Sequence, residues 1–212
     1  METYVVRVWL SDKPGVLGQV ASQIGAIGGD VIGIEILERG GGQAVDELIV
    51  ALPDDVSAGD LAASVSSVQG AGLEEVRLVA GDRPDATVVA LEAAARLTEM
   101  EPAKRVDGLA REVVELFEAA WVNVIDLATG DSVVAMGSGP EAPWLAAFVA
   151  GSRHLAPEDR AATVPADLAW AKVDTHNLAV AVGRPAAFRA RERHQLAMLA
   201  RIVSALAIDP GA

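Results

Sequence analysis

The sequence contains no cysteine, which excludes disulfide bonds, a thiol nucleophile and metal sites that need thiolate ligands. It is also poor in positive charge, with 17 lysine and arginine residues against 30 aspartate and glutamate residues and a formal net charge of −13. Residues 1–80 carry −8 of this charge and the remaining residues carry −5. Because so acidic a surface repels a phosphate backbone, we expect no nucleic acid as a direct partner.

Long apolar runs are missing as well. No stretch approaches the roughly 18 apolar residues that a membrane-spanning helix needs. The N-terminus, Met1-Glu2-Thr3, lacks the basic segment of a signal peptide. About half of the residues are nevertheless apolar, which is enough to bury sizeable cores. The sequence therefore predicts a cytoplasmic protein without a membrane partner.

The patterns of known catalytic sites are missing too. The three histidines, His154, His176 and His194, do not have metal-ligand spacing. The sequence has no Gly-x-Ser-x-Gly elbow and no Walker loop. We therefore predict no catalytic residues, no metal site and no cofactor, in a protein that is not an enzyme. The alternative is an active site of unrecognised type, built from residues scattered along the chain.

The first eighty residues alternate between strand and helix patterns. Period-two alternation predicts strands at 3–10, 31–37, 45–52 and 73–79, and helical spacing predicts helices over 16–27 and 57–68. This order predicts a ferredoxin-like βαββαβ domain over residues 1–80, with two helices on one face of an antiparallel sheet. The alternation assigns Ile32, Ile34 and Ile36 to the core. It assigns to the exposed face, which a second copy or the other domain would cover, Val5, Trp9, Val31 and Leu37.

Two turns flank the first helix of this domain. Pro14 fixes φ at the entry to the helix, and Gly15 allows a sharp turn. A second turn at Gly28-Gly29 closes the helix. Asp12 and Asp30 are the polar side chains of the two turns. We expect both turns to lie on related edges of one small sheet and to bind a ligand there.

This stretch resembles the start of an ACT domain, a βαββαβ module that senses amino acids in biosynthetic enzymes and regulators. The matching residues are Asp12, Lys13, Pro14, Gly15, Val16 and Leu17, followed by Gly29, Asp30, Val31 and Ile32. The resemblance implies that these residues bind a free small amino acid, usually across the interface of a homodimer. Serine-sensing relatives carry amide and imidazole side chains here, whereas this chain has Leu10, Asp12 and Asp30. The two carboxylates favour a ligand with more positive charge.

Asp12 has two possible roles. It would bind the α-ammonium group of an amino acid while the amides at the start of the helix receive the carboxylate. Alternatively, it only accepts hydrogen bonds from the backbone of its own turn, which aspartate does well.

A polar segment containing glycine and proline, residues 81–85, is expected to link the first domain to a second one over 86–212. Helical spacing predicts a helix over 86–100, with Val88, Leu91 and Ala95 on its apolar face. A second helix follows and ends at about residue 119. Two hairpins follow, over 121–136 and 166–182, and then a long helix over 188–206. The whole chain is therefore expected to be α+β, with an antiparallel sheet and flanking helices in its second half.

The end of the second half, Val182-Gly183-Arg184-Pro185 followed by Phe188 and Glu192-Arg193, resembles a GAF domain, a family of small-molecule sensory modules. The resemblance implies a domain that binds its own ligand or one that mainly dimerises. A pocket is expected between the sheet and residues 137–165, where Trp144, Trp170 and Lys172 are candidate lining residues.

Two functional hypotheses follow from these patterns. In the first, the protein is a non-catalytic regulator that binds a small amino acid, forms a homodimer and acts in trans on a partner protein. In the second, it is an interaction or adaptor module that has no ligand, dimerises and binds a partner protein.

Overall fold

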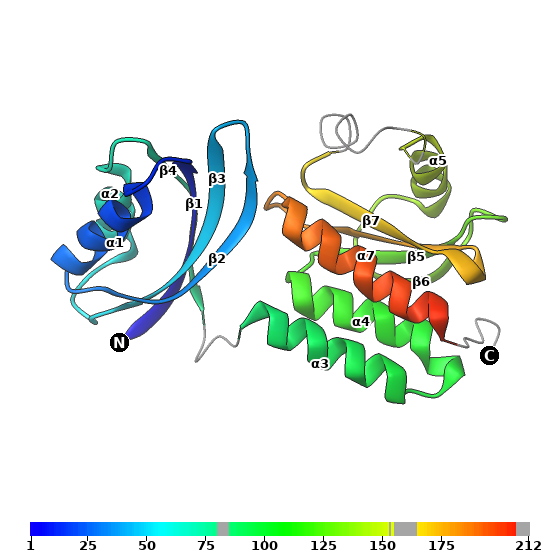
Figure 1. The fold of residues 1–212 in the computed structure, drawn as a ribbon. Coiled ribbons are helices and arrows are strands. Elements are labelled where there is room, and N and C mark those ends of the chain that lie inside the picture. The colour runs from blue at the N-terminus through cyan, green and yellow to red at the C-terminus, as the bar shows by residue number, and fades with distance from the viewer. Residues whose placement is uncertain (80–84, 153, 155–164, 207–212) are drawn as a thin grey trace. The chain divides into compact units, whose positions relative to one another are not determined.

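The computed structural model describes residues 1–79, 85–152, 154 and 165–206. The chain divides into two compact units, Met1–Asp85 and Ala86–Ala212. Each unit is built around an antiparallel sheet of four strands (Figure 1). The predicted α+β class is confirmed. Of the expected linker, residues 81–84 lie outside the described residues.

The first unit has the order expected of a ferredoxin-like fold. Its elements are β1 (Glu2–Ser11), α1 (Val16–Ala26), β2 (Asp30–Gly40), β3 (Gln43–Leu52), α2 (Ala58–Ser66) and β4 (Ala71–Val79). The strands lie in the order β2-β3-β1-β4, with α1 and α2 on one face (Figure 1). The helix α2 begins where Ser57 and Asp60 form a capping box, because each side chain accepts a hydrogen bond from the other residue's backbone amide. The core between the sheet and these helices includes Tyr4, Val6, Val8, Leu10, Val20, Ile24, Leu48, Val50, Leu61 and Val65.

The edge strand β2 departs from the predicted core. Ile32, Ile34 and Ile36 were expected to be buried, but their exposed fractions are 52%, 48% and 46%. The reason is the position of β2 at the outside of the sheet. The buried core beneath α1 and α2 is formed by β1, β3 and the two helices, and β2 adds the partly buried Val31.

The prediction for the opposite sheet face holds only in part, because Val31 packs against the core beneath the helices instead. Trp9 is 41% exposed, but Val5 and Leu37 are buried. Val5 is flanked in register by Ile49 on β3 and Arg77 on β4, whose long side chains lie beside it. Leu37 lies at a register shift of β2, where the simple alternation of faces is interrupted.

The second unit surrounds its sheet with apolar cores on both faces. Its elements are α3 (Ala86–Glu99), the 3-10 helix η1 (Pro102–Lys104), α4 (Arg105–Phe117), β5 (Trp121–Asp126), β6 (Ser132–Gly137), α5 (Ala142–Ser152), β7 (Leu168–Val173), the 3-10 helix η2 (Asp174–His176), β8 (Leu178–Gly183) and α7 (Ala190–Ala205). The strand order is β6-β5-β8-β7. The larger core packs α3, α4 and α7 on one face, and a smaller core packs α5 on the other.

The helix α3 buries a different face from the predicted one. Its buried residues are Ala93 and Leu97. The packing against α4 selects this face, since Arg96 donates two hydrogen bonds of 2.8 Å to the carboxylate of Glu112 on α4. The three residues that were expected to be buried are exposed: Val88, Leu91 and Ala95.

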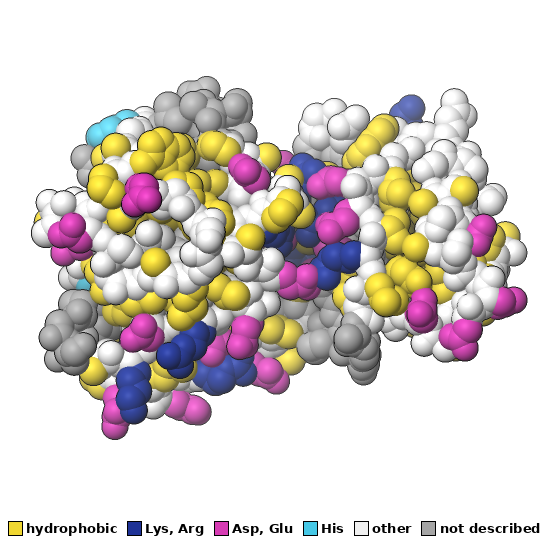
Figure 2. Space-filling view, turned by 180° about the vertical axis from the view of Figure 1, so that it is seen from behind, with side chains coloured by type: hydrophobic (Ala, Val, Ile, Leu, Met, Phe, Trp, Pro, Cys, Tyr) yellow, Lys and Arg dark blue, Asp and Glu magenta, His cyan; other side chains and the backbone are white. Residues whose placement is uncertain are grey.

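The surface carries acidic side chains at many separate places on the face that Figure 2 shows. Among the helices of the described part of the chain, none is both long and apolar enough to cross a bilayer.

Candidate functional site

The turn between β1 and α1 is tied to its neighbours through the backbone. The amide of Asp12 donates to the carbonyl of Gly42 in the β2–β3 hairpin (2.9 Å). Gly15 adopts φ = 93°, the left-handed region, and is the N-cap of α1. Pro14 therefore lies one residue before the N-cap, not in the first turn of the helix. No side chain caps this helix start, so the first-turn amides of Leu17 and Gly18 have no acceptor inside the helix.

The side chains of the predicted turn residues divide into two groups. Val16 is buried in the core and Leu17 packs against it, so these residues offer a ligand only their backbone amides. Asp12, Lys13 and Pro14 are exposed.

Asp12 forms an ion pair that the sequence did not predict. The Nη2 atom of Arg39, at the end of β2, donates to Asp12 Oδ1 at 2.6 Å. The side chain of Asp12 is 38% exposed and that of Arg39 is 59% exposed. This hydrogen bond, together with the nearby negative charge, raises the pKa of the Arg39 guanidinium. The start of α1 thus has one group of each charge beside it.

A buried carboxylate lies near this pair. Asp46 on β3 is 3% exposed, and its Oδ1 atom has no hydrogen-bond partner among the described residues. Burial raises the pKa of Asp46; the positive charge of Arg39 lowers it in part, and the negative charge of Asp12 raises it. The sequence gave no signal for Asp46, because a single aspartate in a strand is usually a solvated residue.

The second predicted turn lies elsewhere. Gly29 is required by packing, since a Cβ there would lie 2.8 Å from Ile24 Cγ2 and 2.9 Å from Leu52 Cδ2. Asp30 is exposed and pairs in register with Ala51, at the end of the sheet where β1 begins.

Asp12 and Asp30 are therefore at opposite ends of one sheet, so the two turns do not meet in one site within a single chain. β1 and β2 are both antiparallel to β3 and thus parallel to each other, so β2 starts at the end where β1 starts. The length of β2, about 30 Å at roughly 3.3 Å per residue, separates the two turns.

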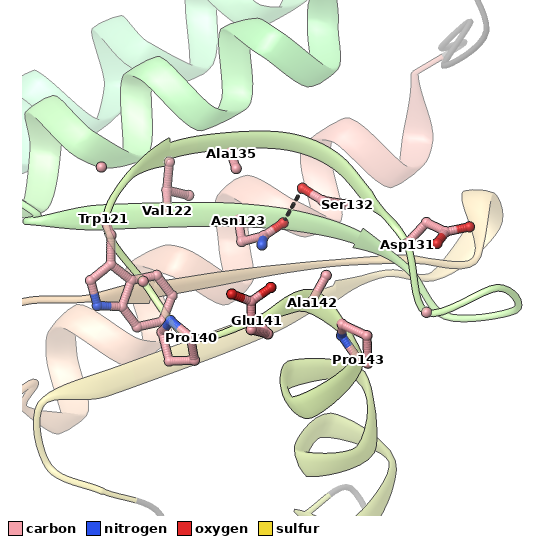
Figure 3. A pocket seen from close by; sticks show the side chains of 13 residues that line it. Trp121, Val122, Asn123, Asp131, Ser132, Ala135, Pro140, Glu141, Ala142 and Pro143 are labelled. Atoms are coloured by element: carbon pink, nitrogen blue, oxygen red, sulfur yellow. Dashed lines mark hydrogen bonds between the residues drawn. The ribbon is translucent and has the colours of Figure 1, made fainter.

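Described residues of the second unit line a pair of cavities on the α5 side of its sheet. A cavity of about 270 Å³ lies between β5, β6 and the segment that leads into α5 (Figure 3). Another of about 420 Å³ is lined by Trp121, Trp144 and Arg184, among others. Both lie against parts of the segment 137–165 at which a pocket was expected, of which residues 153 and 155–164 are outside the described range.

The other two candidate lining residues have different surroundings. Trp170 packs against the smaller core, and Lys172 lies 3.4 Å from the carboxylate of Asp174. His176 is hydrogen-bonded to the carbonyl of Leu206 (2.9 Å). Within the described ranges, no group of three or more histidine, aspartate or glutamate side chains is placed to hold a metal ion.

Comparisons with known proteins find only weak structural similarity. No family model matches the sequence, and no curated protein matches it. A crystal structure of an unknown protein from Galdieria sulphuraria is 19% identical, with a TM-score of 0.32 over 45% of this chain and 64% of that chain. A formyltetrahydrofolate deformylase from Pseudomonas putida KT2440 is also 19% identical, with a TM-score of 0.29 over 45% of this chain and 38% of that one. The chain thus spans less than two thirds of either protein.

Proposed function

We propose that this protein is a cytoplasmic, non-catalytic regulator that binds a small amino acid at the β1–α1 turn, as an ACT domain would, and signals through its GAF-like second unit to a partner protein. The observation that carries the proposal is the exposed Asp12–Arg39 pair beside the uncapped start of α1.

A zwitterionic amino acid matches the charges of this turn. Its carboxylate would be received by Arg39 and the first-turn amides of α1, where the helix dipole favours negative charge. Its ammonium group would be received by Asp12. The existing pair presents little obstacle, because an ion pair this exposed contributes only about 0–1 kcal/mol.

We further propose that the ligand site is completed in a homodimer. The edge strand β2 exposes three isoleucines at alternate positions and has a free side in the sheet of its own unit. An antiparallel pair of two β2 strands centred on Ile34 would place Ile32 opposite Ile36. It would also place Asp30 of the second copy opposite Glu38, next to the residue that pairs with Asp12, and so bring to one end of the sheet the two turns that one chain keeps apart.

Amino-acid binding is tested by thermal shift with each of the twenty amino acids. At about a hundred times its dissociation constant, a true ligand stabilises the protein by roughly 2.7 kcal/mol. We expect a shift for one or a few amino acids that is lost in Asp12→Asn and in Arg39→Ala. The matched control Asp55→Asn removes an exposed aspartate of the same unit and should keep the shift. A flat screen, or a shift that survives both site variants, contradicts the proposed ligand site.

The dimer is tested by sedimentation equilibrium of two lysine variants. A charge on a pairing edge strand opposes association, so Ile34→Lys should give a monomer. Leu78→Lys places the same charge at an exposed apolar residue of the other edge strand, β4, and should remain dimeric. A monomeric wild-type protein, or equal effects of the two variants, argues against pairing through β2.

The second candidate function is an adaptor that dimerises and binds a partner protein without a ligand. The exposed isoleucines of β2 favour it as well, since an apolar edge serves any strand-pairing partner. A flat amino-acid screen together with loss of partner binding in Ile34→Lys would select this function over the first.

A further inference from the structure

The smaller cavity of the second unit is a separate candidate site that has no part in the proposed amino-acid binding. It lies on the face of β5 and β6 that is turned toward α5 (Figure 3). In register, Trp121 faces Gly137 and Asn123 faces Ala135. Because Gly137 and Ala135 are small, the space in front of the edge strand β6 stays open.

One wall of the cavity is the indole of Trp121, and two glycines fix its position. A Cβ on Gly183 would lie 2.3 Å from Trp121 Cε2, and a Cβ on Gly139 would lie 2.6 Å from Cδ2. The ring therefore lies directly against the backbone at both glycines, which leaves it little freedom to turn. A fixed indole offers a flat apolar surface that also attracts cations.

A buried polar side chain reaches the cavity from the sheet. Asn123 is 7% exposed and stands between the apolar Val122 and Val124 on β5. Its Oδ1 accepts a hydrogen bond of 2.7 Å from Ser132 Oγ, which orients the amide. The amide nitrogen is turned toward Glu141 in Figure 3. Within the described part of the chain, this nitrogen has no hydrogen-bond acceptor, and it is accessible from the cavity that Asn123 lines.

The charged residues at the cavity have one sign. Asp131 and Glu141 line it, and its described lining includes no lysine, arginine or histidine. Acidic residues are common on this protein's surface, so two carboxylates alone would not indicate a ligand site (Figure 2). Beside the unpartnered amide of Asn123 and the fixed ring of Trp121, they define what the cavity can hold.

We propose that this cavity binds a small organic ammonium compound that also carries a hydroxyl or carbonyl oxygen. The ammonium group pairs with Glu141, and the ligand oxygen accepts the free hydrogen bond of Asn123. The apolar part of the ligand packs on Trp121.

Three matched probes test this proposal on the full chain by ligand-observed NMR titration at pH 7. The probes share a phenyl ring and a hydroxyl and differ in the third group: 2-amino-1-phenylethanol is cationic, 1-phenylethane-1,2-diol is neutral and mandelate is anionic. None is an α-amino acid, so none carries both of the groups that the proposed site at the β1–α1 turn would bind, and the cavity variants below separate the two sites. Since charge-assisted hydrogen bonds are the stronger ones, we expect the ammonium probe to bind about tenfold more tightly than the diol, and mandelate least tightly.

Variants locate the binding within the cavity. Glu141→Gln should weaken the ammonium probe about tenfold and leave the diol unchanged, because it removes only the charge. Asn123→Ala should weaken both probes, because both use the hydroxyl. The control Glu101→Gln removes an exposed carboxylate, paired with Lys104, at the start of η1 and should change neither affinity. The proposal is overturned if mandelate binds as tightly as the ammonium probe, if Glu141→Gln has no effect, or if no probe binds saturably below about 10 mM.

Discussion

Each of the two sheets pairs a tryptophan with a glycine on the neighbouring strand, and the two pairs have different surroundings. Trp9 faces Gly72 across β1 and β4, and Trp121 faces Gly183 across β5 and β8. In both, a Cβ on the glycine would overlap the ring, at 1.9 Å and 2.3 Å respectively. Trp9 is nevertheless 41% exposed, whereas Trp121 is partly buried and also meets Gly139. The same local pairing thus covers backbone at a surface in one sheet and forms a cavity wall in the other.

The two units also place their buried charges differently. In the first unit, Arg7 and Glu47 form a pair on the sheet itself, with side chains 4% and 6% exposed. In the second unit, Arg184 lies just beyond the end of β8. It donates to the carbonyl of Phe117 (2.7 Å) and to the carboxylate of Glu192, and its guanidinium stands 4.3 Å from the centre of the Phe188 ring. One arginine therefore joins the end of α4, the end of β8 and the start of α7.

Arg184→Ala should have the largest effect on stability. It breaks the ion pair with the buried Glu192 and removes the donor to the carbonyl of Phe117, which costs about 3–5 kcal/mol. The comparison variant in the first unit is Arg39→Ala, which breaks the exposed ion pair with Asp12. It should cost at most about 1 kcal/mol. Urea unfolding is monitored by amide hydrogen exchange in β1 and in β8, which reports the stability of each unit separately. If both variants lose a similar amount of unfolding free energy, then the buried arginine stabilises the protein no more than the exposed one does.

Gly183→Ala should be the next in size, and it tests the paired tryptophans directly. The added methyl group meets the ring of Trp121, which Gly139 blocks on another side, so overpacking should cost about 1–3 kcal/mol. In Gly72→Ala the exposed Trp9 can swing into solvent, and the change should stay within about 0.5 kcal/mol. Thermal unfolding with tryptophan fluorescence measures both. Equal losses would mean that Trp9 is held as firmly as Trp121.

Local alternation was enough for β1, because the residues that alternate with the predicted outer positions Val5 and Trp9 lie in the core: Tyr4, Val6, Val8 and Leu10. It was not enough for β2, because burial there depends on how far α1 and α2 extend over the sheet. Ile34 has the pattern of a core residue in the sequence and is 48% exposed in the fold. The alternation of a strand predicts that two faces differ, and tertiary packing decides what covers each face.

The candidate sites show the same limit. The turn at Asp12 and Gly15 was visible in the sequence, because proline and glycine in that order mark the entry to a helix. The separation of Asp12 from Asp30 could also have been predicted, since a helix that crosses between parallel strands returns the chain to the end where the first strand began. Arg39, Asp46 and Asn123 could not have been predicted, because strand register and burial bring them to their sites and no local pattern marks them.

The smallest expected effect concerns one buried polar side chain from a strand of each sheet, Asp46 on β3 and Asn123 on β5. Burial raises the pKa of Asp46 above its ordinary value of 3.8, so the folded chain keeps a proton that the unfolded chain has already lost. Stability therefore falls as the pH rises from about this value through the raised pKa of the folded state. Asp46→Asn removes the charge and should raise the thermal midpoint at pH 7 by roughly 2–4 °C, the shift that about 1 kcal/mol gives in a chain of this size.

This advantage of Asp46→Asn should vanish below about pH 4, where the aspartate is protonated in both states. The reverse change in the other sheet, Asn123→Asp, adds a charge at a buried position near Asp131 and Glu141 and should lower the midpoint at pH 7. Thermal unfolding of both variants between pH 3 and 8 makes the comparison. If Asp46→Asn is instead the less stable protein at pH 7, then the charge of Asp46 is held by Arg39, and the first unit uses this carboxylate to position the arginine of its proposed amino-acid site.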